Sequence, residues 1–409
     1  MLLSMAFREQ VKQTKDIAMK SEMTYGVSYP TGFLNMDFAN GYIQEINGKI
    51  KYELGISDGS MNMIISDSGV GKTTIATQIA TNIIKPFKTS CIFYEQAEAT
   101  GTNIQRLKNL TGMDDQEFEN RFVVRDSGIT TESIYARTKM IYDIKVNNQS
   151  EYMYNTGMVD IHGKPIYKFE PTVIIIDSVK LVLSEKAAEA EVTTNMTGAQ
   201  NAKTNSEYYS KMLPLCKMAN IIVFFINHIT VDVNTGFLPK KSELAYLKQG
   251  EHIAGGRSLT YIQNNMFRLD IKSKLKPEEG LGISGSIVSL DVIKSRTNTS
   301  SRAKCNLVFD QATGYDNDLS LFIMLKDRKL LEGSGAFLKL PGYDKKFSQK
   351  KFKEELYVDP EFFNIFVVLC INTLKNDLLE EYERIKKENS LCESGKSPYE
   401  AMLEQLYAQ

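Results

Sequence analysis

Short apolar runs followed by polar or turn residues dominate the hydrophobic pattern of this chain. Residues 172–176 and 221–226 are almost continuously apolar and rich in β-branched side chains, which predicts strands buried on both faces. Shorter runs predict further strands at 61–65, 90–94 and 122–124. Runs of this kind are typical of a parallel sheet with both faces covered.

Helical spacing separates these strands. Apolar positions recur with a helical period at 74–80, 133–146 and 206–219. Strands that alternate with helices predict an α/β fold, with a mostly parallel sheet covered by helices on both faces. Outside this core we expect a separate helix at 5–24, an inserted loop or hairpin at 147–170, and a solvated helix with a tail at 371–409.

The loop after the strand at 61–65 carries the strongest chemical signal. It reads Ser-Asp-Ser-Gly-Val-Gly-Lys-Thr and precedes a helix, which is the layout of a phosphate-binding P-loop. Loop N–H groups and the helix N-terminus surround an anion, Lys72 can reach the β- and γ-phosphates, and the Thr73 hydroxyl can ligate Mg²⁺. The motif begins with Ser66 instead of glycine, which reduces backbone freedom but removes no phosphate-binding group. The expected nucleotide contacts are Ser66, Asp67, Ser68, Gly69, Val70, Gly71, Lys72, Thr73 and Thr74.

Composition narrows the class of protein. The chain has 409 residues, of which 42% are apolar and 24% charged, which is ordinary globular usage. Its net charge of −1 means that a nucleic-acid partner would have to be met by local basic loops. The five cysteines form no C-x-x-C pair, which favours a reducing, cytoplasmic compartment over a disulfide framework or a zinc site. No apolar run reaches the roughly 20 residues of a membrane span, so no membrane partner is expected.

Polar side chains follow the predicted strands at the edge where parallel sheets bind ligands. Asp177 ends the strand at 172–176 and is expected to hold Mg²⁺ directly or through water. Glu98 is the first candidate for orienting the attacking water, and Glu95 is its rival. Asn227 and His228 end the next strand. They are expected either to sense the γ-phosphate or to form an ordinary strand end in which the histidine is hydrogen-bonded within the protein.

Two polar loops and one pair of cations are further candidates. The loop at 229–258 carries cations interleaved with aromatic rings, which suits a sugar-phosphate backbone and unstacked bases. The loop at 184–206 is a second polar loop. Lys294 and Arg296 project to the same face of a strand. They are either ordinary surface charges or a pair that reaches the γ-phosphate of a nucleotide bound to a neighbouring subunit, as an arginine finger does. The DNA-binding candidates in the two loops are Met196, Lys203, Lys240, Lys241, Lys248 and Arg257.

These residues together resemble RecA-type recombinases, and most closely the phage branch typified by UvsX. The similar segments follow family order along most of the chain. They are Tyr29–Asp37, the P-loop, Cys91–Tyr94, Ile176–Val179, Ile226–His228, Gly255–Gly256, Lys294–Arg296 and residues 316–360. The departures from the family pattern are Ser66, an acid at Glu98 that lies one residue later than usual, and apparent insertions at 40–54 and 147–170.

The resemblance implies a DNA-dependent ATPase that uses ATP and Mg²⁺ and forms helical filaments on single-stranded DNA. It would pair that strand with double-stranded DNA, with single-strand-binding and mediator proteins as further partners in a phage-infected bacterial cell. Met196 would insert between base triplets, and residues 102–106 are the expected adenine region. The implied layout is a protomer-docking helix at 1–28, a RecA-like P-loop core at 29–315 with DNA-binding loops at 184–206 and 229–258, and a small α+β C-terminal domain and tail at 316–409.

Two other classes stay open at this point. A hexameric replicative helicase motor shares the core and a Lys-x-Arg finger, but the 28 residues before the core cannot form the usual primase-binding domain, and a RecA-like tail is not expected there. A non-enzymatic RecA-like regulator is disfavoured by the intact Lys72, Thr73 and Asp177. The shape of the assembly on single-stranded DNA, an open helix or a closed ring, separates the recombinase from the helicase.

Overall fold

A computed structural model describes most of the chain. The described residues are 26–46, 48–98, 103–159, 163–189, 197–231, 244, 247–253, 256–278, 280–296 and 303–393. The helix expected at 5–24 and the tail from 394 onward therefore lie outside the described residues.

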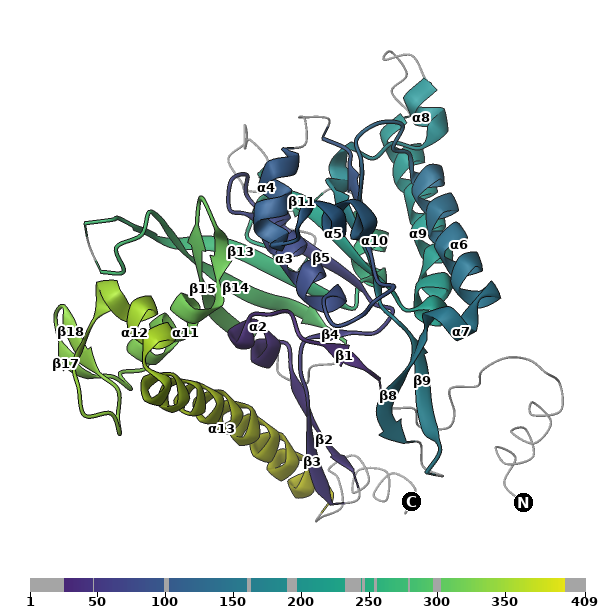
Figure 1. Cartoon of the computed structure of the whole chain (residues 1–409). Helices are drawn as coiled ribbons and strands as arrows, with labels where there is room; N and C mark the ends of the chain where they lie inside the picture. The colour runs from purple at the N-terminus through teal and green to yellow at the C-terminus, as the bar shows by residue number, and fades with distance from the viewer. Residues whose placement is uncertain are drawn as a thin grey trace, which may run out of the picture.

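A ten-stranded sheet runs through the middle of the molecule (Figure 1), in the order β16-β15-β14-β13-β5-β11-β10-β6-β7, with β12 paired to β11. The six strands from β13 to β7 are parallel, and β14, β15 and β16 extend the sheet by antiparallel pairing. The strands are β5 (Met61–Ser66), β6 (Ile92–Gln96), β7 (Phe122–Arg125), β10 (Thr172–Asp177), β11 (Ile221–Val231), β12 (Glu251–Ile253), β13 (Asn265–Leu275), β14 (Gly285–Ser295), β15 (Lys304–Asp310) and β16 (Gly314–Asp316).

Helices cover both faces of this sheet, as the apolar runs predict. Every residue of β5 and β10 is buried, and each face contributes to its own hydrophobic cluster. One cluster holds α3 (Lys72–Ile84), α4 (Ile104–Thr111) and α5 (Asp115–Arg121), and the other holds α6 (Thr131–Asn147), α9 (Thr197–Ala219) and α10 (Gly256–Ile262). The α/β fold with a mostly parallel sheet is thus confirmed.

Local sequence signals set the ends of these helices. The Asn103 side chain accepts the Arg106 N–H at 2.9 Å and caps α4, which ends at Gly112 with φ of 66°. Thr130 and Ser133 form a reciprocal capping box at the start of α6. These contacts satisfy backbone groups that a helix leaves open at its ends.

Residues after β16 form a third hydrophobic cluster. Its elements are α11 (Asn317–Asp327), β17 (Glu332–Ser334), β18 (Phe337–Lys339), β19 (Phe347–Ser348), η2 (Gln349–Lys351), α12 (Phe352–Val358) and α13 (Pro360–Glu393). These elements combine helices with a three-stranded sheet, and the separate α+β domain stays a prediction. Phe38 of α2 (Leu34–Ala39) and Val308 of β15 belong to the same cluster, so packing is continuous across the expected boundary at 316, which stays a prediction.

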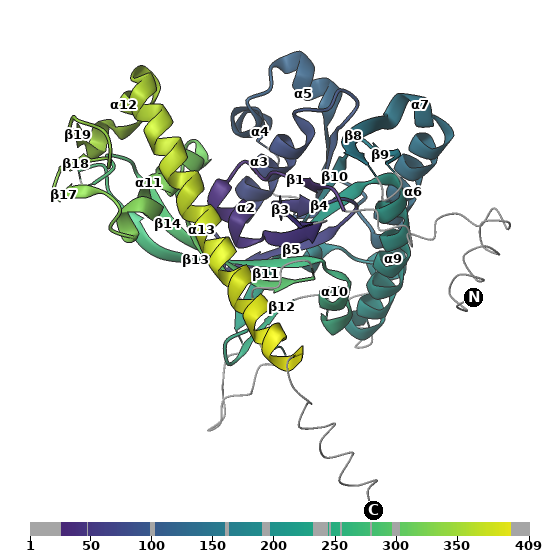
Figure 2. The ribbon, with the colours of Figure 1, turned by 90° about the horizontal axis from the view of Figure 1, so that it is seen from below.

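Helix α13 crosses the underside of the molecule (Figure 2). Its residues Pro360–Glu388 are long and apolar enough to span a membrane by length and composition, with a mean hydropathy of 1.4 in the best window. This differs from the expectation that no apolar run has the necessary length. Phe362, Phe366, Cys370 and Leu374 of this helix are buried in the third cluster, and 28% of the apolar window as a whole is buried.

Two hairpins project from the same side of the sheet (Figure 1), and they correspond to the two apparent insertions. They are β2 (Tyr42–Ile46) with β3 (Lys49–Glu53), and β8 (Met153–Val159) with β9 (Pro165–Phe169), the latter preceded by α7 (Gln149–Tyr152). The buried Asn220 anchors the second hairpin, because its amide donates to the Phe169 carbonyl and the Tyr29 hydroxyl, both at 2.6 Å. Tyr29 lies in β1 (Ser28–Tyr29), which pairs with β4 (Ile56–Ser57).

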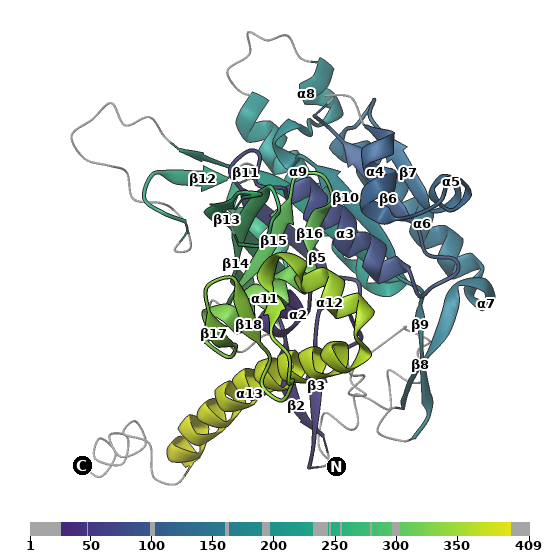
Figure 3. The same ribbon diagram turned by 60° about the vertical axis from the view of Figure 1, so that its left-hand side comes forward.

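Both expected DNA-binding loops contain more regular structure than the sequence indicates. Within 184–206, α8 (Glu185–Glu189) follows the short helix η1 (Val179–Leu181), and α9 begins at Thr197 instead of near 206. Within 229–258, β11 continues to Val231 and pairs with β12 (Figure 3), and α10 follows. The prediction of two long open loops is therefore wrong in extent, since antiparallel pairing and helix packing order part of each.

We expect Phe352→Ala to lower the free energy of unfolding by about 3–5 kcal/mol, because the ring is fully buried against Phe322, Phe347 and Phe366. Phe363→Ala is the matched control, since that ring is 42% exposed on the same unit and should cost about 1 kcal/mol or less. Chemical denaturation measures both values. Equal losses would contradict the third cluster.

Candidate nucleotide-binding site

The loop between β5 and α3 requires two glycines. Gly69 and Gly71 have φ of 78° and 95°, a backbone region that L side chains rarely adopt. A Cβ at Gly71 would also lie 3.0 Å from the Phe309 ring and 3.1 Å from the Tyr315 ring. The Tyr315 hydroxyl donates to the Val70 carbonyl at 2.7 Å. Phe309 of β15 and Tyr315 of β16, two antiparallel strands of the sheet, thus pack against the loop and support it.

Lys72 is the central cation of the site. Only 5% of it is exposed, and its Nζ donates to the carbonyls of Ser66 at 3.2 Å and Asp67 at 2.8 Å. The Ser66 hydroxyl accepts a further bond from Nζ at 3.1 Å, so the serine that departs from the motif binds the lysine directly. Burial lowers the pKa of Lys72 to about 8, and the carboxylates of Asp177, Glu98 and Asp67 partly oppose this.

Asp177 lies across β11 from the phosphate loop. The Thr73 hydroxyl donates to its Oδ2 at 2.5 Å, and the Tyr94 hydroxyl donates to the same oxygen at 3.0 Å. Burial raises the pKa of Asp177, and the bonds from Thr73 and Tyr94 act against this rise. Tyr94 is a site residue that sequence reasoning missed. Its position could have indicated this role, because Tyr94 lies two residues before the end of β6, the strand that pairs with β10.

His228 joins the phosphate loop to Glu98. Its Nδ1 lies 3.3 Å from Lys72 Nζ, and its Nε2 lies 3.0 Å from Glu98 Oε1. Because a lysine ammonium only donates, Nδ1 accepts and Nε2 carries the proton that it donates to Glu98. The fully buried Asn227 accepts the His228 backbone N–H at 2.9 Å and orients this part of the strand.

The two candidate acids occupy different environments. Glu98 lies beside His228 with 32% of its side chain exposed. Glu95 is 1% exposed and forms ion pairs with Arg137 of α6 at 2.6 Å and with Arg125 at 4.0 Å. Burial raises the pKa of Glu95 to about 7, and Arg125 counters this. Alternation along β6 points Glu95 away from the neighbouring Tyr94, so geometry favours Glu98 at the nucleotide.

Lys294 and Arg296 bind the end of α10. Lys294 Nζ donates to the carbonyls of Thr260 at 2.5 Å and Tyr261 at 3.2 Å, and Arg296 also donates to Tyr261. Cations at a helix C-terminus satisfy its open carbonyls and complement its dipole. Burial, followed by repulsion from Arg296, lowers the pKa of Lys294 to about 8. Within the described residues, the side-chain hydrogen bonds of this pair go to the carbonyls at the end of α10.

The remaining predicted residues are described only in part. Lys203 is exposed on α9 and Lys248 is exposed just before β12. Met196, Lys240, Lys241 and the side chain of Arg257 lie outside the described residues. In the expected adenine region, Arg106 NH1 donates to the Gln311 carbonyl at 3.1 Å, which brings α4 beside the turn between β15 and β16.

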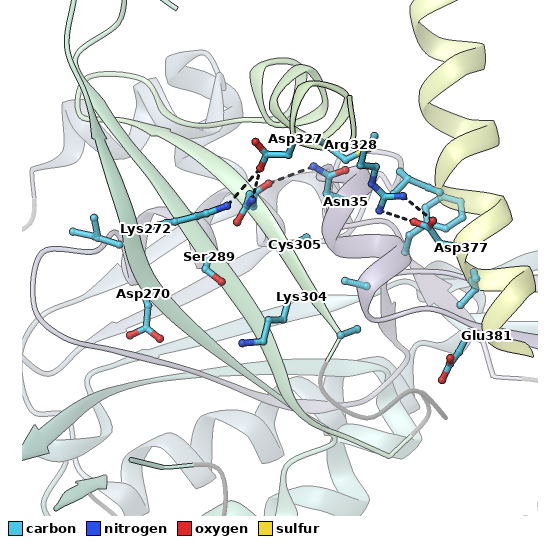
Figure 4. Close-up of a pocket in the computed structure, with 18 residues that line it drawn as sticks. Asn35, Asp270, Lys272, Ser289, Lys304, Cys305, Asp327, Arg328, Asp377 and Glu381 are labelled. Carbon is cyan, nitrogen blue, oxygen red and sulfur yellow. Dashed lines mark hydrogen bonds and ion pairs between the residues drawn. The ribbon is translucent and has the colours of Figure 1, made fainter. Parts of the chain in front are cut away.

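A separate cavity of about 760 Å³ lies between β13–β15 and helices α2, α11 and α13 (Figure 4). Ion pairs between Arg328 and Asp377 and between Lys272 and Asp327 cross its lining. Its cations are thus already paired with acids, unlike the carbonyl-bound Lys72. The loop after β5 is therefore a better candidate than this cavity for binding phosphate.

The residues around the phosphate loop fit a nucleotide with a divalent cation. Gly69 and Gly71 give the loop the positive-φ backbone of a phosphate-binding turn, and the N-terminus of α3 adds a dipole that favours an anion. Lys72 would hold the β- and γ-phosphates. Thr73 and Asp177, already 2.5 Å apart, would hold Mg²⁺, which prefers hydroxyl and carboxylate oxygens.

We expect ATP binding to weaken as the pH rises through about 8, because Lys72 then loses its charge in the free protein. A phosphate next to Nζ favours the ammonium form and raises that pKa again, so binding takes up a proton on the alkaline side. Titration calorimetry in two buffers of different ionisation enthalpy measures this uptake. It should rise from near zero at about pH 7 toward one proton at about pH 9. Equal uptake at both values would contradict the assignment.

Comparison with known proteins gives one distant similarity. The chain is 22% identical over 289 residues to the DNA repair protein RadA of Chlamydia pneumoniae. The match covers 69% of this chain and 49% of that protein, so the chain spans about half the length of the curated relative it matches. No family model matches the chain.

Proposed function

We propose that this chain is a DNA-dependent ATPase of DNA recombination and repair, which assembles as a helical filament on single-stranded DNA and promotes strand exchange. One observation carries the proposal: His228 contacts both Lys72 and Glu98, and its strand continues into the hairpin that bounds residues 232–250. His228 would sense whether the γ-phosphate is present, and its strand leads directly into the segment expected to bind DNA. The similarity to a DNA repair protein supports the same reading.

Each site residue takes a distinct part in hydrolysis. Bound ATP supplies the phosphoryl group and Mg²⁺ the charge that phosphoryl transfer requires. Lys72 would neutralise phosphate oxygens, and Thr73 with Asp177 would hold the metal. Glu98 would orient the attacking water. The hydrogen bond between His228 Nε2 and Glu98 Oε1, 3.0 Å long, would hold the Glu98 carboxylate in place.

A second subunit would complete the site. Extra positive charge at the γ-phosphate contributes roughly 10³–10⁵ to the rate when an arginine finger supplies it. Lys294 and Arg296 are candidates, since Arg296 is exposed and neither residue is bonded to its own phosphate loop within the described part of the chain. Hydrolysis would then depend on assembly, and ATP held between subunits would stabilise the filament.

Glu98→Gln should retain nucleotide and DNA binding but slow turnover by about a hundredfold or more, because the water loses its orienting carboxylate. Glu95→Gln is the matched control. It breaks the buried pair with Arg137, so it should lower thermal stability while the folded protein still hydrolyses ATP. Steady-state ATPase and thermal unfolding separate the two. Normal turnover by Glu98→Gln together with an inactive but folded Glu95→Gln would reverse the assignment.

The assembly itself tests the proposed function. Electron microscopy with single-stranded DNA and a hydrolysis-resistant ATP analogue should show an open helical filament. A closed ring would favour the helicase alternative, and no assembly with no ATPase would favour a regulatory protein.

Mixing Arg296→Ala with Lys72→Ala tests the shared site. Each variant alone should lack DNA-stimulated ATPase, but a mixed assembly contains interfaces in which an intact phosphate loop faces an intact Arg296. Recovery of DNA-dependent hydrolysis in the mixture is the expected result. Mixed filaments that hydrolyse no ATP at any ratio would place the finger within its own subunit or remove it from the mechanism.

A further inference from the structure

Tyr315 of β16 is a buried tyrosine whose hydroxyl contacts the backbone of the phosphate loop. The hydroxyl donates to the Val70 carbonyl at 2.7 Å, and both residues are only 4% exposed. Burial raises the pKa of Tyr315, so the hydroxyl keeps its proton and remains a donor at neutral and mildly alkaline pH. This bond therefore holds the Val70 carbonyl in place.

The bond to Val70 has a consequence for the next residue. The peptide that joins Val70 to Gly71 is trans. In a trans peptide the carbonyl and the N–H point in opposite directions. Since the Val70 carbonyl points at Tyr315, the Gly71 N–H points away from Tyr315. Gly71 is the N-cap of α3, so this N–H belongs to the amides at the helix N-terminus that attract an anion.

Tyr315 is itself held against α3. Its N–H donates to Gln78 Oε1 at 2.9 Å, and Gln78 Nε2 donates to the Tyr315 carbonyl at 3.0 Å. β16 approaches the helix this closely because its first residue is Gly314, where a Cβ would lie 2.9 Å from Gln78 Oε1 and 3.0 Å from Thr74 Cγ2. The ring of Phe309 packs on the Tyr315 ring with centroids 4.9 Å apart. The hydroxyl is thus fixed relative to the helix that the phosphate loop precedes.

We propose that Tyr315 is a positioning residue for the bound nucleotide, because its hydroxyl orients the peptide between Val70 and Gly71 so that the Gly71 N–H donates to a phosphate. This inference rests on the proposed function only in that the loop binds ATP. It extends the nucleotide-binding machinery to β16, because Tyr315 lies 245 residues after Val70 in the sequence. Tyr315 touches no phosphate itself and acts through the peptide that does.

Loss of the hydroxyl alone would leave the ring and its packing in place but would free the Val70 carbonyl. The peptide could then rotate, because Gly71 has few conformational restrictions. A bound phosphate would have to fix the peptide again, and the entropy lost in fixing it would weaken the affinity. The buried carbonyl would also lose its partner, which lowers the stability of the fold. The experiment must separate these two effects.

The experiment compares Tyr315→Phe with Tyr343→Phe in the full-length chain. Tyr343 is the matched control, since it is 2% exposed and its hydroxyl also makes a 2.7 Å bond, to Asp359. Displacement of a fluorescent ADP analogue measures the affinity for ATP and for inorganic tripolyphosphate, which has no base. Tyr315→Phe should weaken both by about fivefold, the effect of one hydrogen bond. Tyr343→Phe should lower the thermal stability but bind both ligands like the unaltered chain.

A second readout tests whether Tyr315 acts through nucleotide binding. The KM for ATP should rise in Tyr315→Phe by about the factor seen in direct binding, with a smaller change in kcat, because a contact made equally in the ground and transition states affects binding only. Gln78→Met keeps the size of the side chain but loses both bonds to the Tyr315 backbone, so it should also weaken tripolyphosphate binding. If Tyr315→Phe does not fold, Gln78→Met carries both measurements.

The outcomes separate this inference from the proposed function. If the unaltered chain binds neither ATP nor tripolyphosphate, both are overturned. If it binds both ligands and Tyr315→Phe binds them equally well, only the positioning role is overturned. The same holds if Tyr315→Phe weakens ATP but not tripolyphosphate, or if Tyr343→Phe weakens binding as much. If the binding data agree but DNA stimulates no hydrolysis, the proposed function fails and the positioning role stands.

Discussion

The parallel register of β5, β11 and β10 is the constraint on which the nucleotide site depends. Register places Ser66 opposite His228, and Asp177 opposite Ile226, so the carboxyl ends of β5 and β10 lie at one edge of the sheet on either side of β11. Parallel strands carry their carboxyl ends to the same edge, where the N-terminus of α3 also lies. A shift of one residue in β11 would turn His228 away from Lys72, because successive side chains face opposite sides of a strand.

Buried charge at this edge is tolerated because each charged group has partners from other segments. Lys72 is surrounded by loop carbonyls and His228, and Asp177 accepts bonds from Thr73 and Tyr94. Without such bonds, a charge at this depth would be strongly unfavourable. Burial lowers the pKa of Lys72 and raises that of Asp177, so both charged forms are disfavoured in the free protein. A phosphate beside Lys72 and a divalent cation beside Asp177 would each stabilise the charged form.

The same sheet connects the nucleotide edge to the proposed DNA and subunit contacts. β11 carries His228 and then the hairpin with β12, while β14 carries Lys294. Lys294 and Arg296 bind the end of α10, which directly follows that hairpin. Packed strands transmit displacement because they have few alternative arrangements. In the proposed function, nucleotide would therefore affect DNA binding through shifts between neighbouring strands.

Local pattern alone determined the α/β class, the buried strands and the phosphate loop, because periodicity and glycine requirements are properties of adjacent residues. Lys72, Thr73 and Asp177 could be assigned in the same way. Tertiary structure showed that Glu98 and Glu95 differ in surroundings, since Arg137 of α6 pairs with Glu95, while the role of Glu98 in orienting water stays a prediction. It also decided that β11 extends to Val231 and that α9 begins at Thr197, because pairing with β12 and packing against the sheet are contacts between residues far apart in sequence.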